Sequence, residues 1–108
     1  MKILVCLITT PNLKSARALA KVLVRGHYAA CVNIIDKVSS YFYWKGKVEK
    51  ASECLLIAKT TRRRFKDLKK KVQSMHPYSV PEIIALPVMD GNKEYLSWVR
   101  GVVKEKNA

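Results

Sequence analysis

The chain has 108 residues and carries 21 Lys and Arg against 8 Asp and Glu, a net charge of +13 at neutral pH. This length predicts one domain over residues 1–108, and a hydrophobic content of 49% supplies a core, which excludes a disordered or fibrous chain. The longest apolar run, residues 3–8, is far shorter than the ~20 residues of a membrane helix, so no membrane insertion is expected. Three cysteines without a C-x-x-C pair predict a reducing, cytoplasmic location.

The first half of the chain predicts a strand, a helix and a long hairpin. A short apolar stretch over residues 2–10 predicts a buried strand. Asn12 is the expected N-cap of an amphipathic helix that ends at Gly26, in the position after the helix that glycine often fills. β-type residues then occupy 28–44 and 47–59, and the intervening Lys45-Gly46 indicates a tight turn.

The second half predicts a helix, a strand and a closing helix. One apolar stripe belongs to a helix that stops before Pro77: Phe65, Leu68, Val72 and Met75. A strand over 83–88, a turn at 90–92 and a last helix through residues 95–103 follow. The predicted fold class is therefore α+β, a ferredoxin-like split βαβ sandwich with both main helices on one face of an antiparallel sheet, plus a C-terminal helix.

The predicted hairpin is too long for a compact monomer. Its shorter arm of 13 residues reaches ~43 Å at ~3.3 Å per residue, whereas a globule of this size is only ~34 Å across. A bulge at Asp36-Lys37 or at Ser39-Ser40 would bend it. The tip carries four consecutive aromatic residues, 41–44, and a two-stranded ribbon is marginal in water, so we expect it to pack on neighbouring copies of the chain. Folding back over its own sheet is the alternative.

The most conspicuous charge feature is residues 59–71, where eight Lys and Arg stand against Asp67 alone. Such a run could bind phosphates. A solvated helix face is the favoured interpretation, because no nucleic-acid-binding motif accompanies it, and nucleic acid is not an expected partner.

Catalytic motifs are missing from the sequence. No nucleophile, base and orienting group have suitable spacing, and the four glycines are isolated, so we do not expect an enzyme. Glu49 and Glu53 should share one face of a strand. His76 lies between a helix end and two prolines, which fits a metal ligand or a rigid turn equally well.

Six short motifs carry a resemblance that spans nearly the whole chain, from Thr9 to Trp98. In order and spacing they resemble the CutA (CutA1) divalent-cation tolerance proteins. The motifs are Ala29-Ala30-Cys31-Val32-Asn33, Tyr43-Trp44-Lys45-Gly46-Lys47, Lys59-Thr60, His76-Pro77-Tyr78, Pro81-Glu82-Ile83 and Tyr95-Leu96-Ser97-Trp98.

The resemblance implies a tight homotrimer, similar in architecture to PII signalling proteins, whose long hairpin reaches across the neighbouring subunit. It also implies tolerance of divalent metals, copper above all, and no firmly attached reaction. His76 matches a histidine for which copper ligation has been proposed. Ile8 and Met75 stand where some bacterial members have Cys and His, so Cys6, on the strand face of Ile8, and the thioether of Met75 are the remaining soft ligands. Four further residues match positions that line clefts between subunits: Trp44, Lys59, Tyr78 and Trp98.

The expected function is therefore that of a homotrimeric divalent-cation tolerance protein that binds copper or another divalent or soft metal ion in a metal-response or signalling role. A basic trimeric module for nucleic acid or other polyanions is one alternative. A scaffold that holds an unidentified protein partner in its clefts is the other.

Overall fold

The computed structural model describes residues 2–104; residues 1 and 105–108, the ends of the predicted domain, lie outside the described part. Its elements are β1 (Ile3–Thr10), α1 (Leu13–Arg25), β2 (Cys31–Trp44), β3 (Lys47–Thr61), α2 (Arg62–Met75), β4 (Ile83–Pro87) and α3 (Lys93–Lys104). The sheet order is β2-β3-β1-β4 with every neighbouring pair antiparallel, which confirms the predicted α+β class and its split βαβ order.

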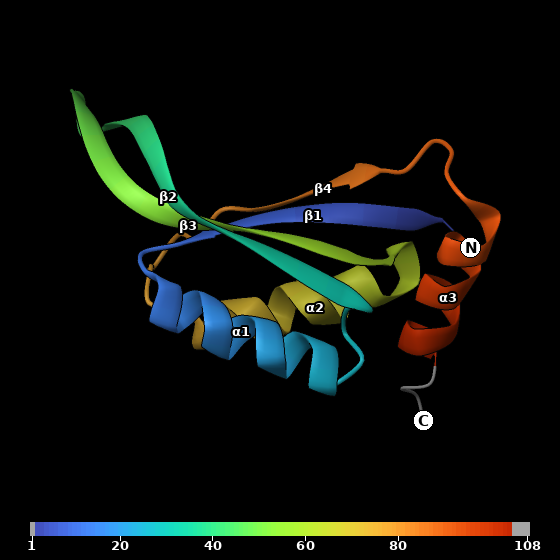
Figure 1. Cartoon of the computed structure of the whole chain (residues 1–108). Helices are drawn as coiled ribbons and strands as arrows, with labels where there is room; N and C mark the ends of the chain where they lie inside the picture. The colour runs from blue at the N-terminus through green and yellow to red at the C-terminus, as the bar shows by residue number, and fades with distance from the viewer. Residues whose placement is uncertain (1, 105–108) are drawn as a thin grey trace.

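Helices α1 and α2 cover one face of the sheet, and α3 packs at one end of the molecule (Figure 1). Because side chains alternate along a strand, Leu4, Cys6 and Ile8 of β1 all point into the layer beneath these helices and are buried. The helices bury their own apolar stripes there, including Leu23 and Leu68. A second, smaller core lies under α3: Ile3, Ala30, Val99 and Val103.

The ends of α1 are fixed by different devices. Asn12 is the N-cap as predicted, and its side-chain oxygen accepts from the backbone N–H of Ser15 at 2.9 Å. At the other end the helix stops at Gly26 as predicted, but Gly26 is the C-cap, with φ −88°, and the left-handed residue that follows it is His27, at φ 61°. Gly26 is also required for a steric reason, since a Cβ there would lie 2.6 Å from Cε2 of Tyr28.

The turn after α1 also corrects the predicted start of the second strand. The backbone N–H groups of Tyr28 and Ala29 both donate to the carbonyl of Leu23, at 2.9 and 3.1 Å. Tyr28 and Ala29 therefore complete the helix end, and the chain joins β3 only from Ala30, whose backbone N–H donates to the Lys59 carbonyl at 2.9 Å. Strand β2 begins at Cys31. Strand β3 also differs from the prediction, because it runs two residues beyond Lys59, to Thr61. The side chain of Thr61 then caps α2.

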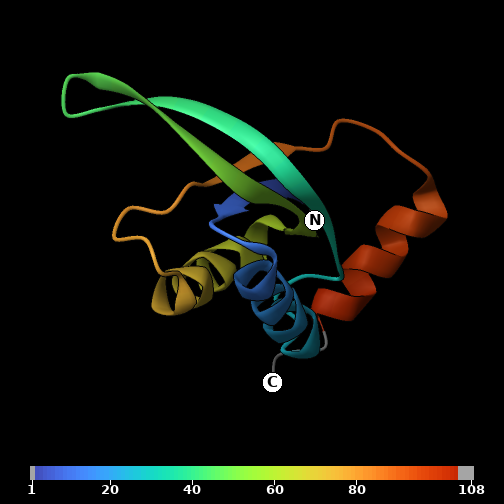
Figure 2. The ribbon, with the colours of Figure 1, turned by 60° about the vertical axis from the view of Figure 1, so that its left-hand side comes forward.

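The long hairpin of β2 and β3 has the predicted turn and bulge. Lys45 and Gly46 both have positive φ, 50° and 79°, as a two-residue type I′ turn requires. The register shifts between Ile35 and Val38, where Lys37 has φ 60°, and the hairpin bends away from the sheet beyond this point (Figure 2). The molecule measures 44 × 27 × 21 Å, and the four aromatic residues at the tip are 44–74% exposed.

The face of the sheet opposite α1 and α2 is apolar and only partly covered. Val5 and Leu7 of β1 point to this face and are half-buried, while Ile3 is buried because α3 covers it. Ile35, Ile84 and Leu86, which point to the same face from β2 and β4, are 47–50% exposed. The single chain therefore leaves a strip of aliphatic side chains in water beside an aromatic hairpin.

Candidate functional site

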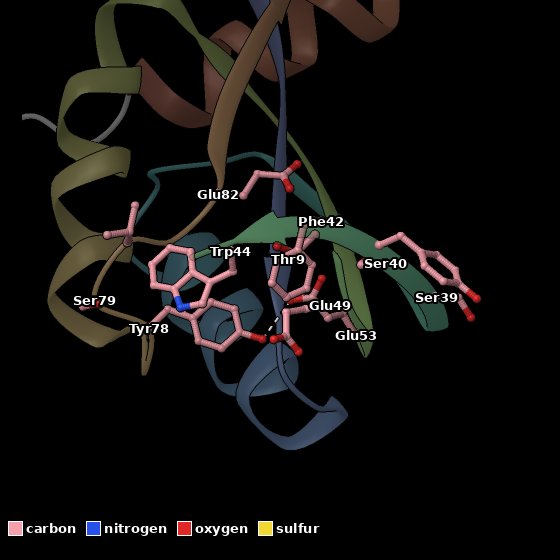
Figure 3. Close-up of a pocket in the computed structure, with 12 residues that line it drawn as sticks. Thr9, Ser39, Ser40, Phe42, Trp44, Glu49, Glu53, Tyr78, Ser79 and Glu82 are labelled. Carbon is pink, nitrogen blue, oxygen red and sulfur yellow. Dashed lines mark hydrogen bonds between the residues drawn. The ribbon is translucent and has the colours of Figure 1, made fainter. Parts of the chain in front are cut away.

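A cleft of about 990 Å³ opens between the hairpin and the loop that follows α2 (Figure 3). The bend of β2 and β3 forms one wall, residues 78–82 form the other, and Thr9 at the end of β1 lies between them. Its lining contains three glutamates and no Lys or Arg, in a chain of net charge +13. The lining residues are Thr9, Ser39, Ser40, Tyr41, Phe42, Trp44, Glu49, Glu53, Tyr78, Ser79, Val80 and Glu82.

Tyr78 and Glu53 join the two walls of the cleft. The Tyr78 hydroxyl donates to Oε2 of Glu53 at 2.8 Å, and Glu53 is only 8% exposed (Figure 3). Burial and the bond to the Glu53 carboxylate raise the pKa of Tyr78 to about 12. A carboxylate removed from water needs donors, and in this cleft the phenol supplies one of them.

His76 fixes the backbone that leads from α2 to Tyr78. Its ring nitrogens are both bonded: Nε2 lies 2.7 Å from the Thr9 carbonyl, and Nδ1 lies 3.1 Å from the backbone nitrogen of Tyr78. A carbonyl can only accept and a backbone N–H can only donate, so the ring is the tautomer with hydrogen on Nε2. The ring also contacts that of Tyr78, with centroids 4.9 Å apart. His76 therefore fixes the turn that presents Tyr78 to Glu53.

The structure brings together two of the three candidate metal ligands. Met75 and His76 line one small cavity of about 400 Å³ between the start of α1 and the end of α2. Cys6 is not among its lining residues: it belongs to the core beneath the helices, where burial raises the pKa of its thiol to about 12. Within residues 2–104, no group of three or more His, Cys, Asp or Glu side chains is placed to hold a metal ion.

The four candidate cleft residues fall into two places. Trp44 and Tyr78 line the cleft, whereas Lys59 and Trp98 do not. Lys59 donates to the side-chain oxygen of Asn33, on the face of the sheet opposite α1 and α2, and its Nζ lies 3.8 Å from Sγ of Cys31. Trp98 lies on α3, and its ring centroid is 5.7 Å from that of Tyr95.

Sequence reasoning overlooked the centre of this site. The spacing of Glu49 and Glu53 predicted only that the two side chains share one face of a strand, and both do line the same cleft. The pairing of Glu53 with Tyr78 gave no signal, because the two residues are 25 positions apart and meet only when the loop after α2 folds against the hairpin.

The protein is therefore a small α+β protein with a four-stranded antiparallel sheet and two helices on one face of it. Its projecting hairpin borders an acidic and aromatic cleft that is large enough for a ligand. A family profile described as CutA1 divalent ion tolerance protein matches residues 4–102. The chain belongs to this family. The predicted resemblance is thereby confirmed, and because the family consists of non-enzymatic tolerance proteins, no reaction is assigned to the chain.

Individual relatives agree over most of the chain. The divalent-cation tolerance protein CutA of Thermus thermophilus is 50% identical over 96 residues, 89% of this chain and 93% of that protein. The structure of Cut A1 from this organism matches with a TM-score of 0.91 and 48% identity, covering 92% of this chain and 96% of that one.

Two other relatives carry a location in their descriptions. The CutA structure from Archaeoglobus fulgidus, described as periplasmic, has a TM-score of 0.91 and 40% identity and covers 94% of this chain and 98% of that one. A rice CutA described as chloroplastic is 39% identical over 102 residues, 94% of this chain and 58% of that protein. In residues 2–104 of the present chain, no helix has the length and apolarity to cross a membrane.

Proposed function

We propose that the protein is a homotrimeric divalent-cation tolerance protein of the cytoplasm, which binds copper or another divalent or soft metal ion in a metal-response or signalling role. Family membership supports the tolerance function. The three cysteines are free, two of them buried, which is typical of a reducing compartment. Metal binding and assembly rest on separate features of the molecule.

The metal site that we propose is His76 with Met75. A histidine that binds a metal through one nitrogen usually donates the other N–H to a carbonyl or carboxylate, and Nε2 of His76 already has such a partner in the Thr9 carbonyl at 2.7 Å. This contact is the observation that carries the proposal. Nδ1 is then the ligand atom, and a metal must displace the longer bond from the Tyr78 N–H, at 3.1 Å. We therefore expect weak binding.

The ligand set favours a soft ion. A thioether and an imidazole suit Cu(I), and Met75 and His76 line the same cavity. Cys6 does not belong to this set, because its thiol is buried in the core and its raised pKa opposes the thiolate that a metal binds.

Metal binding is tested by titrating tag-free protein with Cu(I), in competition with a chelator, and with Cu(II). His76→Ala should weaken both affinities by at least tenfold, and Met75→Leu should weaken Cu(I) more than Cu(II). Met89→Leu is the matched control, since Met89 is a fully exposed thioether in a loop. Equal affinities of wild type and His76→Ala would remove His76 from the site, and circular dichroism verifies that each variant is folded.

The trimer is supported by two apolar surfaces that the single chain leaves in water. One is the aromatic tip of the hairpin, and the other is the aliphatic strip that includes Ile35, Ile84 and Leu86. Both lie away from α1 and α2, so neighbouring copies can cover them without displacing a helix. Apolar burial contributes ~25 cal/mol per Å², which makes such contacts the simplest way to stabilise a projecting ribbon.

Assembly is tested by light scattering at micromolar concentration. The wild type should have a mass of about 37 kDa, three times the 12.3 kDa of the chain. Ile84→Asp should dissociate the assembly, whereas Met89→Asp, with the same charge at a fully exposed position, should not. A folded wild type of 12.3 kDa would overturn the proposed trimer.

A further inference from the structure

Helices α1 and α2 lie side by side on the same face of the sheet and together carry most of the positive charge of the chain (Figures 1 and 2). Four Lys and Arg belong to α1 and seven to α2, against Asp67 as the one acidic residue. We call this surface the basic helical face. Its cationic residues are Lys14, Arg17, Lys21, Arg25, Arg62, Arg63, Arg64, Lys66, Lys69, Lys70 and Lys71.

These charges face water because the helices are amphipathic. The buried positions of α1 are Ala16, Leu19 and Leu23, and those of α2 are Leu68 and Val72. The opposite sides of both helices therefore carry the cations, and nine of the eleven are exposed while Arg64 and Lys71 are partly buried. Asp67 is already paired with Arg64 at 2.7 Å, so neither helix has another carboxylate to offset its charge.

The tertiary structure enlarges the basic run that the sequence revealed on one helix. Lys14, Arg17 and Lys21 follow the helical spacing i, i+3, i+7 and so form a row along one side of α1. With Arg25 this row extends over about 16 Å at 1.5 Å per residue. The row lies on the helix next to α2, and neighbouring helix axes are ~8–10 Å apart. The cations of α1 therefore extend the basic run of α2 into one surface that covers both helices.

A shallow hollow of about 410 Å³ lies within this surface. Arg64, Lys70 and Lys71 line it together with Ser74, Tyr28 and the paired Asp67. The ammonium groups of Lys70 and Lys71 are donors that suit the oxygens of a phosphate group. The Arg64 guanidinium adds its positive charge but is already bonded to Asp67 and to the carbonyls of Gly26 and His27.

We propose that the basic helical face binds the sugar-phosphate backbone of double-stranded nucleic acid without reading its sequence. A duplex carries one negative charge per ~1.7 Å of its axis, which complements a two-dimensional array of cations. Because α1 and α2 pack against each other, neither projects alone as a helix that enters the major groove. Contacts to phosphates without contacts to base edges follow from this shape.

An anionic membrane fits the surface less well. Helices that lie in a bilayer interface insert large apolar side chains, and the basic helical face exposes only Val24 and Met75 of that kind, at 40% and 39%. The apolar sides of both helices are committed to the core. Nucleic-acid binding does not rest on the metal site or use any of its residues, so each proposal can fail alone.

The test is fluorescence anisotropy of a labelled 24-base-pair duplex of arbitrary sequence, titrated with the protein between 50 and 200 mM salt. The face variant combines Lys21→Gln, Lys66→Gln and Lys70→Gln. The control variant combines Lys2→Gln, Lys93→Gln and Lys104→Gln, which removes the same charge from exposed positions outside the two helices. Circular dichroism and light scattering verify that both remain folded and equally assembled.

We expect the wild-type association constant to fall by 10³-fold or more over this salt range, as for six or more phosphate contacts. The face variant should bind at least tenfold more weakly at 100 mM salt and with a shallower salt dependence, while the control stays within twofold of wild type. Equal losses in both variants would show that net charge alone is responsible and would overturn the proposal. So would no duplex binding at 50 mM salt, or binding to phosphatidylserine vesicles in place of the duplex.

Discussion

Tyr78 and Glu53 meet across the cleft through a hydrogen bond of 2.8 Å, and this contact ties the loop after α2 to the bend of the hairpin. Glu53 is buried, and the residues that line the cleft include no cation to pair with it. The phenol of Tyr78 is therefore a main donor to a carboxylate that has little contact with water. His76, which fixes the backbone of Tyr78, supports the same contact from the other side of the loop.

The Tyr78 phenol should titrate abnormally. An unfolded tyrosine has a pKa near 10, and the folded value is about 12, because burial and Glu53 both oppose the phenolate. The folded state retains a proton that the unfolded state has lost, so this stabilisation is complete below pH 10 and disappears as pH rises through 12. The loss should be about 1 kcal/mol, less than the ~2.7 kcal/mol of two full pKa units, because Tyr78 is partly exposed.

Urea unfolding of wild type and Tyr78→Phe at pH 8 and pH 11 measures this effect, since the variant removes the group and leaves the remaining alkaline titrations in place. The difference in unfolding free energy between the two proteins should shrink at pH 11. An unchanged difference would contradict the raised pKa. In Glu53→Gln, absorbance at alkaline pH should show that the Tyr78 pKa falls only partly toward 10, because burial is the larger cause.

His76→Ala should destabilise the fold even without metal. The substitution leaves the Thr9 carbonyl and the Tyr78 N–H without their ring partners, which costs about 1–3 kcal/mol of unfolding free energy. Chemical denaturation in the presence of a chelator measures it. Met89→Ala, at a fully exposed position, should change stability by less than ~0.5 kcal/mol. A metal-free His76→Ala as stable as wild type would show that the ring bonds contribute nothing.

Two glycines should respond to alanine with opposite signs. At Gly26 the new Cβ would lie 2.6 Å from the ring of Tyr28, so Gly26→Ala should cost about 1–3 kcal/mol. Gly101 lies within α3, where a Cβ would meet nothing within 4 Å, so Gly101→Ala should stabilise by about 0.5–1 kcal/mol through helix propensity. Thermal unfolding of both variants tests the pair. Equal shifts would contradict the steric role of Tyr28.

Arg64 should be sensitive even to lysine. Its guanidinium donates to the carbonyls of Gly26 and His27, both at 3.2 Å, and lies 4.5 Å from the ring centre of Tyr28. Lysine has no planar fork with which to make these contacts together, so Arg64→Lys should lose about 1–2 kcal/mol. Arg63→Lys is the matched control, because Arg63 is exposed on the same helix. Equal stability of the two variants would show that Arg64 does not anchor the end of α1.

Much of the local structure follows from short-range patterns. Asn12 caps its helix, Lys45-Gly46 forms the tight turn and Asp36-Lys37 carries the bulge, because backbone bonding and left-handed φ angles depend on a few adjacent residues. The end of α1 was predicted only in part. Gly26 ends the helix as expected, but its lack of a Cβ also serves the packing of Tyr28, a tertiary contact that no local pattern reveals.

By itself, the amino-acid sequence determined the order of strands and helices, the overlong hairpin and the family, since periodicity and motif spacing are properties of the chain. Only the tertiary structure decided which distant side chains meet: Glu53 with Tyr78, His76 with Thr9, and the cations of α1 with those of α2. It also separated Cys6 from His76. The physical reason is that such pairs depend on how two elements pack, and a linear pattern records the face of each element but not the neighbour that it receives.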